Sequence, residues 1–429
     1  MIRRMGTYFL AAVLTLAGSA AVSGEPMPAP CAAAIAAASP GPSPEVGRME
    51  QVIQSFVAGK QFMGSVLVAR GNDKLLDKGY GYADLEWNIP DSPNTKYRLG
   101  SVTKQFTAAS VLLLQERGKL NVQDLVKKYM PEAPAGWDKI TIFNLLTHTS
   151  GIPNFTDFPD YESFALAPTT PEQLVKRFRD KPLDFQPGEK WKYSNSGYAL
   201  LGYLIEKISG QSYQTFLQEN IFKPLGMTES GYDSNFTVIP DRASGYTRFG
   251  DGFNNAGYVN MTVPFAAGGL FSTTDDLLRW EEALFGRKLL SAASLKEMTT
   301  PFKNDYAFGL DVHTVNGHKV IEHAGGIDGF NTVLAYYPED RLTVVVLANL
   351  DGSAAGEVAQ DLATLAEGGK VVLTSERKVV HIDPKIFDGY VGSYQLAPNF
   401  ILKVTRNGDR FMTQATGQGA VEIFPESDH

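Results

Sequence analysis

The chain has 429 residues, of which 43% are hydrophobic and 20% are charged, and its formal net charge is -8. This composition is typical of a globular protein long enough for two or three domains, and it excludes a disordered or collagen-like chain. An acidic chain lacks the basic face needed for general electrostatic binding of nucleic acid, so we expect no nucleic-acid partner. The single cysteine, Cys31, excludes an intramolecular disulfide and a zinc site built from cysteines.

The first 24 residues have the pattern of a secretory signal peptide. Arg3 and Arg4 precede a short apolar run, and Ala21-Val22-Ser23 offers a cleavage site. The apolar run is far shorter than the roughly 20 residues that span a bilayer, so we expect no integral membrane span in the mature chain. The protein is therefore expected to be exported, to the periplasm or the extracellular space of a bacterium. Residues 25–42, rich in alanine and proline, predict a linker.

Residues 43–368 predict one α+β domain that begins with a helix at Pro44. Two strands should follow, then a mainly helical stretch, a polar surface excursion rich in Gly, Asn and Asp, and a second group of strands before a last helix. The expected strands are 62–69, 74–83, 319–323, 332–337 and 342–348; the clearest helices are 101–118, 141–148, 197–209 and 354–367; the excursion is 231–264.

Strands occur at both ends of this domain and helices between them. We therefore expect the two groups of strands to join in one antiparallel sheet with a helical insertion, which is α+β and not alternating βαβ. A boundary at Gly368-Gly369 precedes residues 371–429, which predict four short antiparallel strands. Four strands are too few to close a small barrel, so this C-terminal β module is expected to be short and incomplete or to remain an open sheet.

The strongest chemical feature is Ser101-Val102-Thr103-Lys104 at the start of an apolar helix. Residues three apart share a helical face, so the Lys104 amine can reach the Ser101 hydroxyl. Serine needs a nearby base or cation to become a nucleophile, and lysine can act as the base if burial lowers its pKa. The start of a helix also offers free N–H groups to an oxyanion. Alone, the same tetrad also fits a capping serine beside a solvated lysine.

Two further motifs strengthen the catalytic interpretation. Tyr193-Ser194-Asn195 precedes a helix; a phenol near a lysine can lose its proton more easily and act as a base, and Asn195 can donate to a substrate carbonyl. His323-Ala324-Gly325-Gly326 ends a predicted strand, where the glycines allow a substrate backbone to approach closely. The alternatives are a packed tyrosine at a helix start and an ordinary hairpin turn.

In this order and at these separations, SVTK, YSN and H-x-G resemble the serine β-lactamase and penicillin-binding-protein superfamily, over about residues 43–366. The Tyr-x-Asn form is similar to class C β-lactamases, and the histidine is similar to the D-alanyl-D-alanine carboxypeptidases and esterases of that branch. The resemblance implies a β-lactamase/transpeptidase-like fold and an acyl-enzyme on Ser101. Lys104 and Tyr193 would share proton transfer, and Asn195, His323 and Gly325 would contact substrate. The N–H groups of Ser101 and Gly326 would form the oxyanion hole.

One departure from the family pattern bears on the substrate. The third motif often carries a hydroxyl where this chain has Ala324, and that hydroxyl helps to bind a substrate carboxylate. Together with a neutral His323, it weakens the expectation of penicillin hydrolysis and leaves peptide, amide and ester hydrolysis open. The resemblance thus implies an exported serine hydrolase acting on D-Ala-D-Ala-type peptides, D-amino-acid amides or β-lactam-like substrates. A carboxylesterase is one alternative, and a penicillin- or peptide-binding protein with little turnover is another.

The remaining sequence signals predict neither a metal nor a cofactor. His148 lies in a leucine-rich segment and is interpreted as a hydrogen-bonded structural residue. His313, His318 and His323 are spaced by five, which alternates the faces of a strand, and the sequence contains no H-E-x-x-H pattern. It also contains no G-x-S-x-G elbow and no phosphate-binding loop. The expected partner is a small-molecule or peptide substrate, and the oligomeric state stays open.

Overall fold

The structure is a computed structural model that describes residues 43–376, 380–397, 400–417 and 419–426. The predicted signal peptide (1–24) and linker (25–42) lie outside the described residues. Within the described part of the chain, no helix is both long enough and apolar enough to cross a bilayer.

The sheet of the larger domain has six antiparallel strands in the order β10-β11-β12-β13-β1-β2. β1 pairs with β13 from Gly64↔Ala348 to Arg70↔Leu342, so strands from the two ends of the domain do join in one sheet, as expected. The strands are β1 (Gly64–Arg70), β2 (Asp73–Tyr80), β10 (Asp311–Val315), β11 (His318–Ile327), β12 (Phe330–Tyr337) and β13 (Leu342–Ala348).

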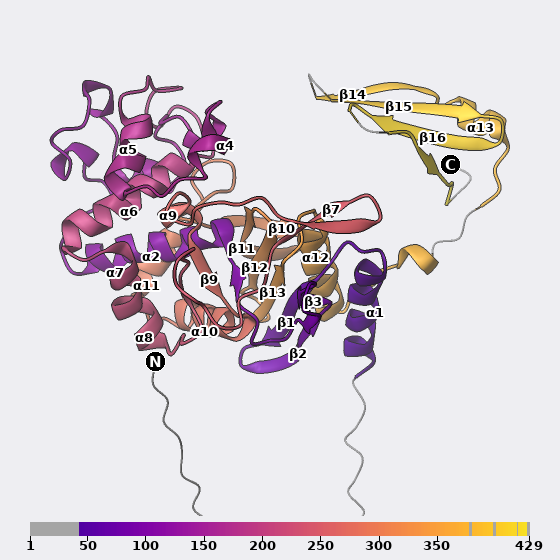
Figure 1. Ribbon diagram of the computed structural model, residues 1–429, viewed down its shortest axis with the longest axis horizontal. Helices are drawn as coiled ribbons and strands as arrows, with labels where there is room; N and C mark the ends of the chain where they lie inside the picture. The colour runs from indigo at the N-terminus through magenta and orange to yellow at the C-terminus, as the bar shows by residue number, and fades with distance from the viewer. Residues whose placement is uncertain (1–42, 377–379, 398–399, 418, 427–429) are drawn as a thin grey trace, which may run out of the picture. The chain divides into compact units, whose positions relative to one another are not determined.

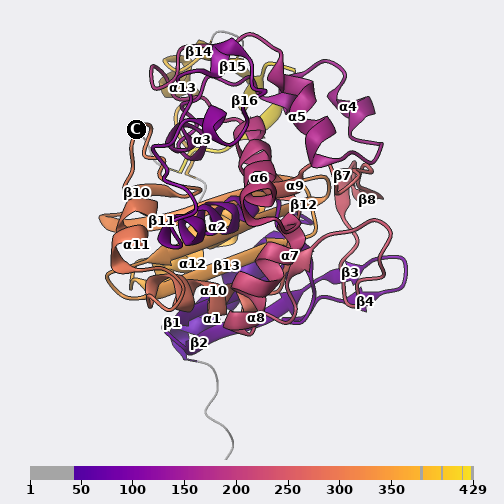
Figure 2. The same cartoon turned by 90° about the vertical axis from the view of Figure 1, so that its left-hand side faces the viewer.

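Helices cover both faces of this sheet, which explains why every residue of β13 is buried. On one face, Val344 and Val346 pack with α1 (Pro44–Ala58) and α12 (Ala354–Ala366). On the other, Val345 and Leu347 belong to the larger core with α2 (Thr103–Glu116) and α10 (Thr274–Phe285). Figures 1 and 2 show α12 and α2 on opposite sides of the strands.

The helical insertion lies between β2 and β10 and shares the larger core. Nearly all of α2 is buried, because it runs between the sheet and the insertion. The other helices are α3 (Ile142–Leu146), α4 (Tyr161–Phe164), α5 (Pro171–Arg179), α6 (Asn195–Ser209), α7 (Tyr213–Leu217), α8 (Lys223–Leu225), α9 (Phe265–Gly268) and α11 (Ala292–Met298), with a 3-10 turn η1 (Gly100–Val102) before α2.

Three details differ from the sequence-based expectation. The strand expected at 74–83 ends at Tyr80, because Gly81 has a φ of 78° and redirects the chain into a separate short pair, β3 with β4. The 231–264 segment is not only a surface excursion, since Val259, Met261 and Val263 are buried in the main core. β10 was not expected, because it is an edge strand with one fully buried residue and no apolar alternation.

The remaining strands of the larger domain are β3 (Tyr82–Asp84), β4 (Ile89–Pro90), β5 (Tyr97–Arg98), β6 (Gly231–Tyr232), β7 (Tyr246–Phe249), β8 (Gly252–Asn255) and β9 (Leu270–Ser272).

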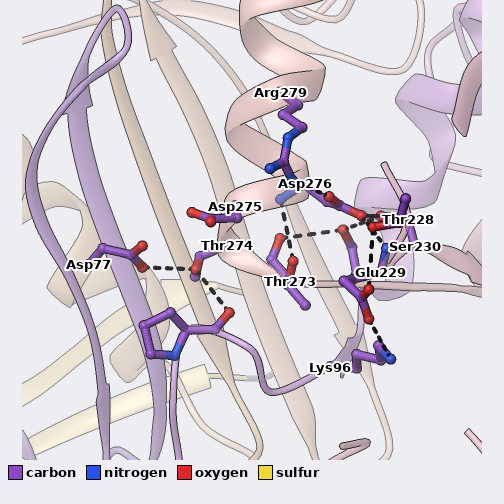
Figure 3. A network of polar contacts seen from close by, with 12 residues as sticks. Asp77, Lys96, Thr228, Glu229, Ser230, Thr273, Thr274, Asp275, Asp276 and Arg279 are labelled. Atoms are coloured by element: carbon purple, nitrogen blue, oxygen red, sulfur yellow. Dashed lines mark hydrogen bonds and ion pairs between the residues drawn. The ribbon is translucent and has the colours of Figure 1, made fainter. Parts of the chain in front are cut away.

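A polar network fixes the start of α10 against the chain that follows α8 (Figure 3). Thr273 caps the helix by accepting from the Asp276 N–H at 3.3 Å. The fully buried Asp276 carboxylate accepts from the Glu229 N–H and the Ser230 hydroxyl, each at 2.8 Å, and from Arg279 at 2.7 Å. A carboxylate in the first turn of a helix is also favoured by the helix dipole. The network therefore holds two segments together with its charge balanced.

The C-terminal module is a separate four-stranded antiparallel sheet with the order β14-β15-β16-β17, in agreement with the four expected strands. Its small core stacks Phe387 on Phe411, with ring centroids 4.0 Å apart. Phe387 belongs to a short helix that was not expected. The elements are α13 (Pro384–Asp388), β14 (Gly392–Ala397), β15 (Phe400–Asn407), β16 (Arg410–Ala415) and β17 (Val421–Ile423).

Candidate active site

Ser101 lies in η1, the 3-10 turn that leads into α2. The preceding Gly100 has a φ of 53°, and a Cβ on it would meet the Gly326 backbone nitrogen at 2.8 Å. Glycine is required here both by the left-handed backbone and by this close approach. The turn therefore presents Ser101 directly beside the end of β11, although the two segments are far apart in the sequence.

Lys104 is one helical turn further on and is completely buried. Its Nζ atom lies 2.9 Å from Ser101 Oγ, 2.9 Å from Asn195 Oδ1 and 2.8 Å from the Ala267 carbonyl oxygen. No carboxylate forms an ion pair with Lys104 among the described residues, and burial lowers its pKa well below the usual range. The surroundings suit a neutral amine. Its two N–H groups can donate to the two carbonyl oxygens, which leaves its lone pair facing the Ser101 hydroxyl.

Tyr193 reaches the same oxygen from the other side. Its hydroxyl donates to Ser101 Oγ at 2.7 Å, and its ring lies 4.7 Å from Lys104 Nζ. Burial raises the pKa of Tyr193 well above its usual range, and the hydrogen bond to Ser101 offsets this only in part. The expected easy loss of the phenolic proton is thus corrected. Tyr193 is a neutral hydrogen-bond donor at rest, because Lys104 lies over its ring face and not beside its oxygen.

Asn195 begins α6 and is held in a fixed orientation. Its backbone N–H donates to Asn154 Oδ1 at 2.9 Å, its Oδ1 accepts from Lys104, and its Nδ2 donates to Thr156 Oγ1 at 3.3 Å. Because the oxygen is turned toward the amine, the amide nitrogen is the atom left for a ligand. The donation from Asn195 to a substrate carbonyl stays a prediction.

A cavity of about 270 Å³ opens in front of Ser101. Its lining combines η1, the 155–161 segment, the start of α6, α9 and the end of β11. Gly100, Ser101, Phe155, Thr156, Tyr161, Asn195, Pro264, Ala267, Gly268, Gly326, Ile327 and Asp328 line it. Ser101, Asn195 and Gly326, which come from the three sequence motifs, therefore line one space. The only charged side chain in this lining is the exposed Asp328.

His323 and Gly325 do not line this cavity, which changes their expected roles. The buried His323 ring lies with Nδ1 2.6 Å from the Ala324 carbonyl oxygen and Nε2 3.0 Å from the Tyr306 hydroxyl. Burial lowers the pKa of His323 to about 3, so Nδ1–H donates and Nε2 accepts. A Cβ on Gly325 would lie 2.0 Å from the Leu99 carbonyl oxygen. Gly325 therefore allows β11 to approach the chain at the start of η1, whereas the His323 ring packs near Tyr306 and Tyr193. Alternate residues of a strand point to opposite faces, so both point away from the face that carries Gly326.

His148 is a structural residue, as interpreted from the sequence. It is buried, its Nδ1 accepts from the Ser194 N–H at 3.2 Å, and burial lowers its pKa well below the usual range. Its ring lies 4.4 Å from the Tyr193 ring and 4.6 Å from the Tyr306 ring, measured between centroids. His148 therefore supports the position of Tyr193 through packing.

Sequence reasoning missed four contributors to this site: Thr156, the Ala267 carbonyl, Tyr306 and Asp328. Thr156 lies shortly before α4, and Asp328 follows the His323–Gly326 motif by two residues. A closer look at those two neighbourhoods could have found them. Tyr306 and the Ala267 carbonyl carry no local signal, since an isolated tyrosine and a backbone oxygen acquire their roles only through the fold.

Comparisons with known proteins identify the family of the chain. The β-lactamase family model matches residues 49–368. Penicillin-binding protein 4* of Bacillus subtilis is 32% identical over 86% of this chain and 87% of its own length. The octameric penicillin-binding protein homologue from Pyrococcus abyssi superposes with a TM-score of 0.70 at 29% identity, covering 89% of this chain and 91% of that one. A D-stereospecific amidohydrolase from Streptomyces gives a TM-score of 0.64 at 28% identity, covering 76% and 98%. The chain therefore belongs to the β-lactamase family, the serine hydrolase superfamily that includes the penicillin-binding proteins.

Proposed function

We propose that the chain hydrolyses amide or peptide bonds through an acyl-enzyme on Ser101, and that its preferred substrates carry no carboxylate near the scissile bond. The observation that carries the substrate part is the charge of the cavity. Asp328 lines it, and no lysine, arginine or histidine among the described residues does. An anionic substrate would find no counter-charge there, whereas an amine-bearing one would find a carboxylate.

The first half-reaction follows from the contacts of Ser101. Neutral Lys104 takes the Ser101 proton as Oγ attacks the substrate carbonyl carbon, since its Nζ atom lies 2.9 Å from Ser101 Oγ. The developing oxyanion is stabilised by the backbone N–H groups of Ser101 and Gly326. As the C–N bond breaks, Tyr193 donates its proton to the leaving amine and regains one from Lys104. The net transfer is one proton from Ser101 to the leaving group.

The second half-reaction releases the acyl group to water. The water loses a proton to the Lys104–Tyr193 pair as it attacks the ester carbonyl, and the same pair returns a proton to Ser101 Oγ when the ester bond breaks. The Asn195 amide nitrogen orients the substrate during both steps. Thr156 keeps that nitrogen on the cavity side by accepting from it.

Similarity to the Streptomyces D-stereospecific amidohydrolase supports an amide of a D-amino acid as the acyl donor. The electrostatics of the cavity add to this. Asp328 is exposed, and no cation pairs with it within the described part of the chain. Together with burial, its charge raises the pKa of the neighbouring Tyr161, which also lines the cavity, to about 12. A free α-ammonium group on the substrate would therefore meet an unneutralised carboxylate.

Three substrates that share the p-nitroaniline leaving group but differ in charge test the proposal. D-Alanine p-nitroanilide is cationic, its N-acetyl derivative is neutral and its N-succinyl derivative is anionic. We expect kcat/KM to fall from the first to the last, with the anionic substrate at least about 10-fold below the cationic one, or about 1.4 kcal/mol. Asp328→Asn should bring the three values together. Equal values in the unaltered protein would reject the charge argument, while the acyl-enzyme would stand.

The acyl-enzyme has its own test. Intact-protein mass spectrometry of rapidly quenched reactions should show a mass increase equal to the acyl group, located on Ser101. Ser101→Ala should abolish both the adduct and the turnover of all three substrates. Ligand uptake or turnover that persists in Ser101→Ala would reject the covalent mechanism, whatever the substrate preference.

We further propose that the mature chain starts after residue 24 and is exported. We also propose that 43–368 and 371–429 are separate folding units, since the C-terminal strands form a sheet and a small core of their own. The leader pattern at 1–24 supports export. N-terminal sequencing of protein secreted by a bacterial host should begin close to Gly24 or Glu25. A chain that retains Met1 in the cytoplasm would reject this.

A further inference from the structure

A second cluster of metal-ligating side chains lies outside the cavity of Ser101, at the edge of the main sheet. His318 begins β11, Asp340 lies in the turn between β12 and β13, and Glu367 is the C-cap residue of α12. One ligand atom from each of the three lies within 4.8 Å of the others. His318 Nδ1 is 3.2 Å from Glu367 Oε2, close to the spacing of about 3.3 Å between donors around a tetrahedral Zn²⁺.

Glu367 is the residue that points to a ligand. Its side chain is only 10% exposed, and its Oε1 atom is buried without a hydrogen-bond partner. A buried carboxylate oxygen without a donor is costly, so native structures normally satisfy it with protein, water or an ion. Asp340 cannot satisfy it as an anion, because two carboxylates repel each other.

The charges around these three side chains are also mainly negative. Glu339 adds a third carboxylate, 3.8 Å from His318 Nδ1. The C-terminal end of α12 has a negative potential, so a carboxylate at its C-cap is unfavourable. Among the described residues, no lysine or arginine nitrogen forms an ion pair with Glu367 or Asp340. The nearby Arg70 guanidinium donates instead to the Ala366 carbonyl.

We propose that His318, Asp340 and Glu367 bind one divalent transition-metal ion, with Zn²⁺ as the best match for one imidazole and two carboxylates. The ion would tie the start of β11, the β12–β13 turn and the end of α12 together. Its role is structural, because none of its ligands lines the cavity in front of Ser101. The sequence did not suggest this site, since its ligands come from three separate elements.

Zinc binding by the full chain tests the proposal, measured by equilibrium dialysis with ZnCl₂ and elemental analysis. All samples carry Cys31→Ser, so that a free thiol does not add its own affinity for zinc. We expect one Zn²⁺ per chain, removable by EDTA, and at least a 10-fold weaker affinity in His318→Gln and in Glu367→Gln. His313→Gln is the matched control, because His313 pairs with Glu322 at 3.4 Å on the same strand pair, but among the described residues it belongs to no group of three close ligand atoms. It should bind zinc as the parent does.

Thermal unfolding separates the site from a folding defect. In EDTA, Glu367→Gln should melt at or above the temperature of the parent, because the substitution removes carboxylate repulsion. With ZnCl₂, only the parent and His313→Gln should gain stability. Non-saturable zinc uptake, or equal affinity in Glu367→Gln and His313→Gln, would overturn the proposal.

Discussion

Two buried polar clusters in this domain contain similar groups but have different roles. Around Asp276, a buried carboxylate accepts from a backbone N–H, a serine hydroxyl and an arginine (Figure 3). Around Ser101, a buried amine contacts a serine hydroxyl and two carbonyl oxygens. Both are nearly complete in hydrogen bonds. They differ in charge balance, because Asp276 has a cationic partner and Lys104 has no anionic one.

That difference separates a stabilising network from a reactive one. A buried carboxylate is destabilised by burial, which raises the pKa of Asp276, but its hydrogen bonds and the Arg279 cation offset this, so that it can hold two segments together. A buried amine without a partner tends to lose its proton, which makes it a base at neutral pH. The Ser101 cluster also faces a cavity, so its reactive oxygen can meet a substrate. Substitutions in the two clusters should therefore change different measured quantities.

The largest effect is expected from Lys104→Met in the reactive cluster. Without the amine, Ser101 has no base, so kcat/KM should fall by about 10³-fold or more. The free energy of unfolding should change far less, because the substitution also removes the cost of burying an amine. Steady-state kinetics with a p-nitroanilide and urea unfolding would measure both quantities. A variant that keeps a tenth of the activity would show that Lys104 is not the base.

Tyr193→Phe should have the next largest effect. It removes the hydroxyl that donates to Ser101 Oγ but keeps the ring that packs on His148. We expect kcat/KM to fall by about 10²-fold, since proton transfer to the leaving group is lost. Amides with better leaving groups should recover part of the rate, because they need that proton less. A loss that is independent of the leaving group would instead assign Tyr193 a role in orienting Ser101.

The three motifs could be read directly from the sequence, because each is a short spacing of residues. Local periodicity predicted the strands at both ends of the domain, and hence their common sheet, as well as the C-terminal strands. These patterns did not predict which way a side chain turns. His323 belongs to the third motif, yet strand alternation directs its ring to Tyr306 and away from the cavity. Asp328 lies in the turn between β11 and β12, outside the motif, and does line the cavity. Edge strand β10 was missed since an edge needs little apolar alternation.

In the stabilising network, Asp276→Ala should act on folding and not on catalysis. The Glu229 N–H and the Ser230 hydroxyl would lose their acceptor, so we expect a loss of about 2–3 kcal/mol in the free energy of unfolding. The kcat/KM per folded molecule should stay within about threefold. Asp275→Ala is the control, because its ion pair with Lys74 is partly exposed and contributes at most about 1 kcal/mol. Equal losses in the two variants would contradict the assigned role of Asp276.

The smallest expected effect concerns pH and distinguishes Lys104 from His323. The base must be neutral, so kcat/KM should rise with pH through the lowered pKa of Lys104 and then level off. Tyr193, whose pKa is raised, should add no alkaline limb near neutrality. His323 titrates at about 3 and is therefore neutral throughout the range above about pH 5.

His323→Gln should then leave the acidic limb of the pH profile in place, with kcat/KM within about threefold of the parent. The free energy of unfolding should also depend on pH through Lys104. Folded Lys104 binds fewer protons than unfolded Lys104 between its lowered pKa and about 10.4, so the free energy of unfolding should rise with pH across that window. A limb that moves by more than about half a pH unit in His323→Gln would assign the titration to the histidine. The unpaired amine would then no longer be the feature that separates the reactive cluster from the one around Asp276.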